Sequence, residues 1–201
     1  LRLILKLPDS LDTHDLLVSD GKIICVSTGS NEIHWYDFSG KQIKKWKAKG
    51  EQDAWHLNCL TEKNGELFIS AFGEFDTHRG WLDNSKSSGF IMNVQTGEKV
   101  VDGLSGPHNP RYLEEGSWAV CDSHNKGLAI KHVDGTVSSV DLGGFTRGFA
   151  LDDSYFYVGV SADRNHSSQD ENSHIAVIDR GTLQISETIP VPFPEIYDIV
   201  A

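Results

Sequence analysis

A short hairpin pattern recurs four times along this 201-residue chain. Each copy is an alternating apolar strand, a tight turn containing glycine and a second alternating strand, which is typical of a β-hairpin. The copies are "HWYDFSGKQI" (34–43), "IMNVQTGEKV" (91–100), "IKHVDGTVSS" (130–139) and "AVIDRGTLQI" (176–185). A second hairpin precedes each of them, so each repeat of roughly 40–50 residues holds four short strands in a meander. This repetition predicts an all-β protein, a β-propeller built from four-stranded antiparallel blades.

The competing architecture is a two-sheet sandwich, whose strands do not recur in regular groups of four. We expect a single propeller domain over residues 1–201, with blades at about 12–48, 54–104, 106–143 and 145–191. Residues 1–8 and 194–201 resemble the outermost and innermost strands of an incomplete blade. Either these two segments pair as a partial fifth blade, or the chain is a fragment of a larger propeller of about five to seven blades.

Composition narrows the class of partner. The net charge of −11 and the lack of a basic stripe argue against a nucleic-acid partner. No apolar run approaches the roughly 18 residues of a membrane helix, so we expect no membrane partner. Three widely spaced cysteines, Cys25, Cys59 and Cys121, favour a reducing compartment, and we expect a cytoplasmic protein.

Polar residues recur where each innermost strand begins. Alignment of the repeats superimposes five stretches: His14-Asp15, His56-Leu57-Asn58, His108-Asn109-Pro110-Arg111, Thr146-Arg147-Gly148 and Glu195-Ile196-Tyr197-Asp198. The innermost strands of a propeller line its central channel, so we expect these stretches to share one channel mouth. The three histidines then represent one repeated position.

The chemistry at this mouth has several interpretations. His14, His56 and His108 could bind a divalent metal, with Glu195 or Asp15 as a carboxylate ligand. His56, His108 and Glu195 could instead act as catalytic acids and bases. Alternatively, these polar groups only hydrogen-bond one another and ordered water.

The two arginines of the mouth, Arg111 and Arg147, suit a carboxylate or phosphate, or else they pair with nearby acids. Two long loops, 71–90 and 161–174, each join the second and third strands of a repeat. These loops lie at the same end of a meander as the entry to its first strand, so both should overhang the same mouth. Long loops in compact domains are often functional. Trp55 and the loop residue Trp81 could stack on a flat ligand. The predicted ligand-binding set is Asn58, Asn109, Arg111, Arg147, Tyr197, Asp198, Glu74, Asp76 and Trp81.

Five motifs carry a resemblance to a known family. "WHLNCL", "FGEFDTHRGWLDN", "GLSGPHNPRY", "GFTRGFAL" and "PEIYDI" resemble, in order, the motifs of a bacterial propeller family catalogued as a domain of unknown function. The resemblance runs from about His14 to Asp198. The family's usual Gly-Gly-Trp is Arg79-Gly80-Trp81 here, and its Pro-His-Ser-Pro-Arg carries Asn109 in place of serine.

The resemblance implies a propeller and brings no activity with it. A looser similarity in shape links the family to gluconolactonase-like and strictosidine-synthase-like propellers, which hold a metal with carboxylate and amide ligands. This chain offers mainly histidines, so that site does not transfer. We therefore expect a propeller that binds a polar small molecule or glycan-like ligand at its channel mouth, with metal-assisted hydrolase or lyase activity as one form of this hypothesis. The alternative is a non-catalytic scaffold for a protein or peptide partner.

Overall fold

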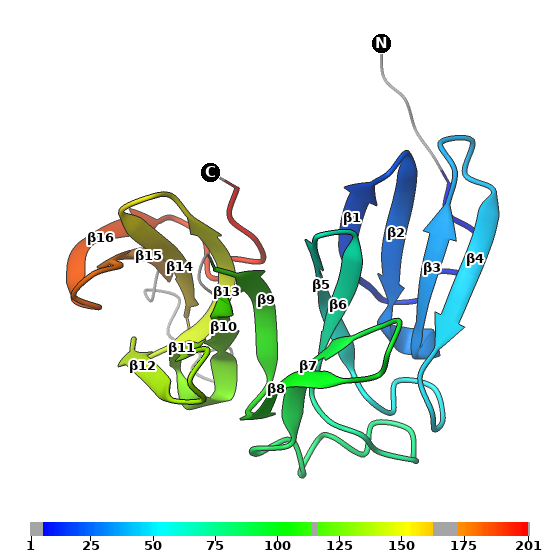
Figure 1. Cartoon of the computed structure of the whole chain (residues 1–201), viewed down its shortest axis with the longest axis horizontal. Helices are drawn as coiled ribbons and strands as arrows, with labels where there is room; N and C mark the ends of the chain where they lie inside the picture. Colours follow the sequence, from blue (N-terminus) through cyan, green and yellow to red (C-terminus); the bar gives the residue numbers. More distant parts are fainter. Residues whose placement is uncertain (1–5, 114–115, 163–172, 201) are drawn as a thin grey trace. The chain divides into compact units, whose positions relative to one another are not determined.

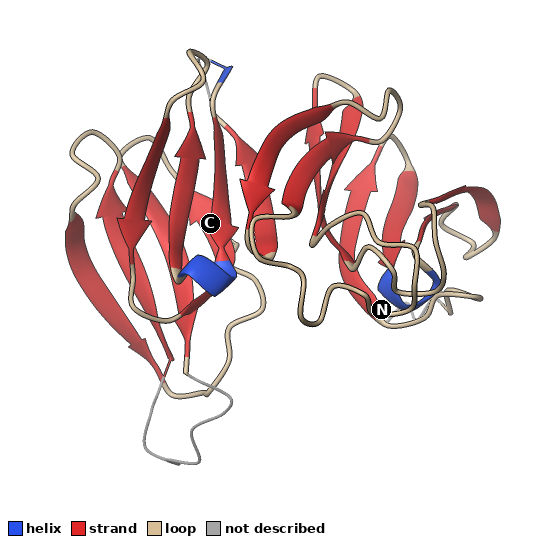
Figure 2. Cartoon of the chain, turned by 90° about the horizontal axis from the view of Figure 1, so that it is seen from below, coloured by secondary structure: helices blue, strands red, loops and turns tan. Residues whose placement is uncertain are grey.

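The structure, a computed structural model, describes residues 6–113, 116–162 and 173–200. Within these residues, sixteen strands form four antiparallel sheets of four strands each (Figures 1 and 2). The strands are β1 (Thr13–Ser19), β2 (Lys22–Ser27), β3 (Glu32–Tyr36), β4 (Gln42–Lys47), β5 (Leu57–Lys63), β6 (Glu66–Ala71), β7 (Gly89–Asn93), β8 (Lys99–Leu104), β9 (Pro107–Tyr112), β10 (Trp118–Asp122), β11 (Gly127–Lys131), β12 (Val137–Asp141), β13 (Phe145–Leu151), β14 (Tyr155–Ser161), β15 (Ser173–Asp179) and β16 (Ile185–Val191). Each sheet is a meander of consecutive strands, which confirms the all-β class and the four-stranded blades.

The chain divides into two compact units, residues 1–104 and 105–201, and each is described by itself. In the first unit, β1 packs beside β5, and the two sheets share an apolar core that includes Val26, Ile33, Leu57 and Phe90 (Figure 1). In the second unit, β9 packs beside β13 around a core that includes Leu128, Phe149, Phe156 and Ile178. In each core, the apolar side chains on the inner faces of two neighbouring sheets pack against each other.

Trp55 belongs to the core of the first unit. Its side chain is buried, and its ring makes edge contacts with Trp46 (6.4 Å between centroids) and Phe90 (5.6 Å). The prediction that Trp55 stacks on a ligand is therefore wrong. The apolar area of an indole is better buried between two sheets than left at a channel mouth.

The four recurring hairpins share one turn chemistry. At the start of each turn, a side-chain oxygen accepts a hydrogen bond from the backbone N–H two residues further on, at 2.8–3.0 Å. The accepting residues are Asp37, Asn93, Asp134 and Asp179. This Asx turn reverses the chain locally, which explains why the repeat is visible in the sequence.

The innermost strands are all irregular at equivalent places. In β5, β9 and β13, two residues oppose one on the neighbouring strand: Asn58-Cys59 opposite Ser70, Asn109-Pro110 opposite Val120, and Arg147-Gly148 opposite Gly159. In β1 the extra residue is His14. Such β-bulges bend the strand and redirect the side chains at the bulge. The predicted polar stretches of β1, β5, β9 and β13 therefore coincide with these bulges.

The same registers separate the three histidines. His14 is itself the extra residue of its bulge, His108 is the last paired residue before its bulge, and His56 precedes β5 altogether. The prediction that they represent one repeated position is therefore wrong at the level of single residues. An alignment by sequence alone does not detect the residue that each bulge adds.

The ends of the chain have no strand among the described residues 6–12 and 192–200. Residues 6–12 lie against the first blade, where the Tyr36 hydroxyl donates to the Pro8 carbonyl at 2.6 Å. The expected partial fifth blade from residues 1–8 and 194–201 stays a prediction, and parts of both segments lie outside the described residues.

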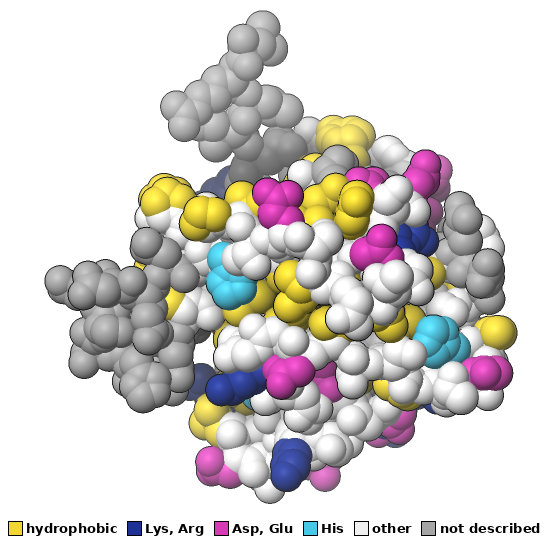
Figure 3. All heavy atoms as spheres, turned by 90° about the vertical axis from the view of Figure 1, so that its left-hand side faces the viewer, with side chains coloured by type: hydrophobic (Ala, Val, Ile, Leu, Met, Phe, Trp, Pro, Cys, Tyr) yellow, Lys and Arg dark blue, Asp and Glu magenta, His cyan; other side chains and the backbone are white. Residues whose placement is uncertain are grey.

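The expectation of no nucleic-acid and no membrane partner stays a prediction. Two observations concern it. Among the described residues, no helix has the length and apolar character that crossing a membrane requires. On the face shown in Figure 3, Lys and Arg side chains are scattered among acidic and neutral ones, without a basic stripe.

Candidate functional site

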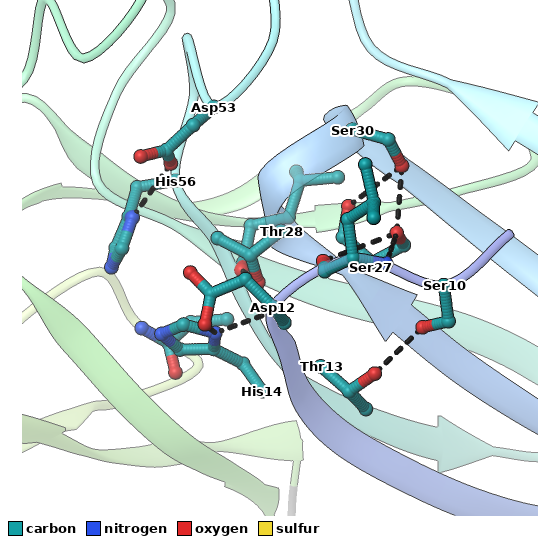
Figure 4. A network of polar contacts seen from close by, with 12 residues as sticks. Ser10, Asp12, Thr13, His14, Ser27, Thr28, Ser30, Asp53 and His56 are labelled. Carbon is teal, nitrogen blue, oxygen red and sulfur yellow. Dashed lines mark hydrogen bonds and ion pairs between the residues drawn. The ribbon is translucent and has the colours of Figure 1, made fainter.

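The first unit holds an imidazole–carboxylate pair just before β5. His56 Nδ1 lies 2.8 Å from Asp53 Oδ1, and both side chains are largely buried (Figure 4). The two residues stand three apart in a tight turn, with φ of +50° at Asp53 and +49° at His56. Left-handed backbone is uncommon outside glycine, costs of order 1 kcal/mol or more, and is often found at functional sites.

Asp53 fixes the orientation of His56. An ionised carboxylate only accepts hydrogen bonds, so the Nδ1 of His56 is the donor in this pair. Arg79 Nε lies 3.5 Å from the other carboxylate oxygen of Asp53. Nε2 of His56 forms no hydrogen bond within the described part of the chain, and the side chain is 12% exposed. The exchangeable position of the ring is therefore Nε2.

Aromatic rings enclose His56. Trp81 packs on it at 4.1 Å between centroids and Phe72 at 4.4 Å, and His14 meets its ring edge-on at 5.0 Å. Trp81 is held in turn by a hydrogen bond from its Nε1 to the Asp53 carbonyl at 3.1 Å. Trp81, predicted to close over a ligand, therefore packs against the histidine of the pair.

His14 is held by the segment before β1. Its Nδ1 lies 3.0 Å from the Asp12 carbonyl and 3.8 Å from the Asp12 carboxylate (Figure 4). The next residue, Asp15, accepts a hydrogen bond from the Leu60 N–H of β5 at 2.7 Å, which joins the innermost strands of the two blades. Two of the three predicted histidines thus come together in the first unit.

The other predicted residues of the first unit lie elsewhere. Glu74 pairs with Lys99 of β8 at 3.1 Å, and exposed Asp76 contributes its backbone carbonyl to Glu51. Neither carboxylate is seen at His56. Asn58 is fully buried at the bulge of β5, where its side-chain oxygen accepts from Cys59 Sγ at 3.3 Å.

In the second unit, His108 lies in the packing between β9 and β13. It is 3% exposed, and its Nδ1 lies 2.9 Å from the Gly106 carbonyl and 2.7 Å from Ser123 Oγ. Ser123 donates to the Thr146 carbonyl of β13 at 2.5 Å. These contacts favour a structural role for His108, which helps to join two blades.

Four predicted ligand-binding residues come together in the second unit. Arg147 lies over the ring of Tyr197 at 4.0 Å. Asn109 donates from Nδ2 to Asp198 at 3.1 Å and accepts from the Gly148 N–H at 2.8 Å. The segment 195–198 thus lies along the bulges of β9 and β13. Two further predicted residues are Arg111 and Glu195, and both are half-buried. Arg111 donates to the Pro110 carbonyl at 3.1 Å.

A metal centre finds little support in this arrangement. Within the described residues, no group of three or more His, Cys, Asp or Glu side chains is arranged to hold a metal ion. The metal site predicted at His14, His56 and His108 therefore gains no support from the geometry and stays a prediction.

One residue of this candidate site is missing from the prediction made from the sequence. Asp53 lies three residues before His56 in "DAWH", and this spacing was a signal that a tight turn could bring the two together. Most of loop 161–174, also predicted to overhang the mouth, lies outside the described residues.

Comparison with solved structures supports the propeller fold. A streptogramin B lyase superposes with a TM-score of 0.59 at 19% identity, over 94% of this chain and 57% of that one. A virginiamycin B lyase from Staphylococcus aureus superposes with a TM-score of 0.57 at 14% identity, over 97% of this chain and 76% of that one. That structure is a catalytically inactive histidine-to-alanine variant with quinupristin. A gluconolactonase-like protein superposes with a TM-score of 0.55 at 14% identity, over 91% of this chain and 63% of that one.

These similarities concern the fold alone. The chain spans between about half and three quarters of the length of these structures. Among curated proteins, no match is found. The family comparison is more informative, because one family model matches residues 4–200 and confirms the resemblance seen in the five motifs. The chain therefore belongs to the DUF4915 family, a domain of unknown function.

Proposed function

We propose that this protein is a small-molecule-binding propeller of the lyase or hydrolase class, in which His56 moves a proton to or from a polar substrate. The observation that carries the proposal is the buried His56–Asp53 pair at 2.8 Å, which leaves Nε2 as the exchangeable position. A histidine held by a carboxylate is the commonest general acid–base device in enzymes.

Each residue around the pair has a role in this proposal. Asp53 is a positioning residue, since it selects the tautomer of His56 and stabilises the imidazolium that forms when Nε2 takes a proton. Arg79 Nε, 3.5 Å from the second carboxylate oxygen of Asp53, helps to hold this carboxylate in its orientation. Trp81 and Phe72 limit the rotation of the imidazole and exclude water from its flanks.

The reaction class is suggested by the names of the propeller lyases and of the gluconolactonase-like protein, whose similarity to this chain shows the fold alone. One of these neighbours is inactive when a histidine is replaced by alanine. The similarity is too distant to transfer a substrate, so the substrate panel must be broad.

The test is a turnover assay with the full chain. Quinupristin and a panel of lactones, the compounds that the neighbours' names suggest, are incubated with the protein and analysed by mass spectrometry. Opening of a ring by hydrolysis adds the mass of one water, whereas elimination leaves the mass unchanged. We expect His56→Gln to lower kcat/KM by about 10²–10⁴-fold, the usual contribution of a general acid–base.

The matched control is His78→Gln, in the same loop as Trp81. His78 is exposed, and its Nδ1 lies 2.8 Å from the Gln52 carbonyl, so its loss should leave turnover unchanged. Asp53→Asn should lower kcat and also change the ¹⁵N shifts of the His56 ring, because the tautomer is no longer fixed. Equal turnover in His56→Gln and wild type would exclude the proposed role of His56, and the lack of turnover of every compound in wild type would favour the non-catalytic scaffold.

A further inference from the structure

Arg147, in the bulge of β13, is a buried arginine with an unsatisfied donor. Arg147 is only 8% exposed. Nε is fully enclosed and has no hydrogen-bond partner among the described residues. The ion pairs formed within the described ranges do not include Arg147.

A guanidinium in this position differs from other buried cations. Lysine and histidine lose a proton when burial makes their charge costly, but arginine stays charged at any accessible pH. A buried charge is destabilising unless it is paired and hydrogen-bonded. The cation–π contact with Tyr197 at 4.0 Å offsets part of this cost, but it satisfies neither Nε nor the net charge.

Asp198, in the segment that packs beside Arg147, accepts hydrogen bonds from other groups. Asp198 Oδ1 accepts hydrogen bonds from Asn109 Nδ2 at 3.1 Å and from the Ile199 N–H at 2.9 Å. Asn109 Oδ1 also has a partner, because it accepts from the Gly148 N–H. None of these hydrogen bonds comes from Arg147, and no ion pair joins Arg147 to Asp198 among the described residues, so the guanidinium lacks a directly paired counter-charge there.

The backbone around Arg147 is closely packed. A Cβ on Gly148 would lie 3.1 Å from both the Asp198 backbone and the Ile196 side chain, and a Cβ on Gly159 would lie 2.7 Å from Ile196. The absence of side chains at these two positions lets segment 196–198 pack closely on β13 and β14. This packing holds Tyr197 against the guanidinium while leaving 57% of Tyr197 exposed.

We infer that Arg147 is an anion-binding residue whose two terminal Nη groups, which are not enclosed, take a carboxylate or phosphate group of a ligand. The two Nη groups present N–H donors whose spacing matches two oxygens of either anion. The inference concerns the second unit alone and does not depend on the proposed role of His56.

The test measures thermal stabilisation of the full chain by simple oxyanions. Inorganic phosphate and acetate are titrated separately at constant ionic strength, with sodium chloride as the reference salt. An anion present at ten times its Kd should raise Tm by roughly 3–6 °C for a chain of this size. The two titrations distinguish a phosphate from a carboxylate site.

Arg147→Met should abolish the anion-dependent rise in Tm. Arg147→Lys keeps the charge but loses the two-pronged edge, so it should fold and bind about tenfold more weakly. The matched control is Arg180→Met, because Arg180 also lies over an aromatic ring, that of Phe156 at 5.4 Å, and donates to a backbone carbonyl. Arg180→Met should keep the full rise.

Two outcomes would overturn the inference. The first is an equal rise in Tm for wild type, Arg147→Met and Arg180→Met, which indicates a general salt effect. The second is the absence of any rise in wild type together with an unchanged or higher Tm in Arg147→Met, which means that the guanidinium needs no anion.

Discussion

The innermost strands of the two units share a frame but hold different chemistry. In each unit, a side chain of the first innermost strand accepts a backbone hydrogen bond from the second. Asp15 accepts from the Leu60 N–H at 2.7 Å in the first unit, and Asn109 accepts from the Gly148 N–H at 2.8 Å in the second. Beside these links, the first unit holds an imidazole with its own carboxylate, whereas the second holds a guanidinium without one.

This difference shows where function can change in such a repeat. The bulges are backbone features, and different residues stand at them in the four blades. His14, Asn58, Asn109 and Arg147 occupy these places in the four blades. The fold therefore supplies positions, and the chemistry has to be argued from each side chain.

The largest expected effect distinguishes the residues opposite two bulges. Gly159 faces the bulge of β13, and a Cβ added there would clash with the Arg147 carbonyl. Gly159→Ala should lower the free energy of unfolding by about 3 kcal/mol, the upper end of the usual cost of overpacking. Ser70, opposite the bulge of β5, accepts from the Cys59 N–H at 3.1 Å and donates to the Cys59 carbonyl at 3.4 Å, so Ser70→Ala should cost about 1–2 kcal/mol.

Chemical denaturation of both variants measures this contrast. Equal losses at Gly159 and Ser70 would mean that the two bulges tolerate the same side chains. The frame would then be more alike in the two units than their contacts indicate.

The next effect concerns the two links between blades. Asp15→Ala and Asn109→Ala should each cost about 1–2 kcal/mol, because a buried N–H loses its acceptor. The conservative changes should differ: Asp15→Asn keeps an acceptor oxygen, whereas Asn109→Asp replaces the donor to Asp198 with a second carboxylate. We expect Asn109→Asp to be the less stable of the two at neutral pH and to regain stability on acidification. Equal stability of the two variants, at neutral pH and in acid, would contradict this assignment.

The architecture could be predicted because its signals are local. Each Asx turn is encoded by an Asp or Asn at its start, and alternation marks the strands on either side. The predicted blades, 12–48 to 145–191, contain the observed strands for the same reason. The polar stretches that the repeat aligned overlap the bulges, although the sequence did not predict the bulges themselves.

The site was harder to predict, because it depends on directions that the sequence does not show. The contact of His56 with Asp53 requires left-handed backbone at both residues, and the alignment centred on the histidine missed the aspartate. The pairing of Arg147 with Asp198 was equally plausible from the sequence. It is absent from the described contacts because Asp198 turns toward Asn109 and its own neighbouring N–H.

The smallest effect concerns the hairpin turns, where the two units differ in charge. Both turns of the second unit begin with an aspartate, Asp134 and Asp179, whereas the first unit has Asp37 and the neutral Asn93. Hydrogen bonds to the carboxylates lower the pKa of each aspartate below its ordinary value. The main donor is the Ser39 side chain for Asp37, the Thr136 side chain for Asp134 and the Thr182 N–H for Asp179.

The pH dependence follows from these directions. A carboxyl whose pKa is lower in the folded chain contributes stability above the pKa of the unfolded chain, about 3.9, and loses it as the pH falls further. In an amide-resolved NMR titration from pH 6 to pH 3, the N–H signals of Ser39, Thr136 and Gly181 should therefore move with midpoints below 3.9. The Gln95 N–H signal should stay in place, because Asn93 has no proton to gain. A Gln95 signal that moves with the same midpoint would mean that the shifts report general acid unfolding, and the charge difference between the turns would then have no part in acid stability.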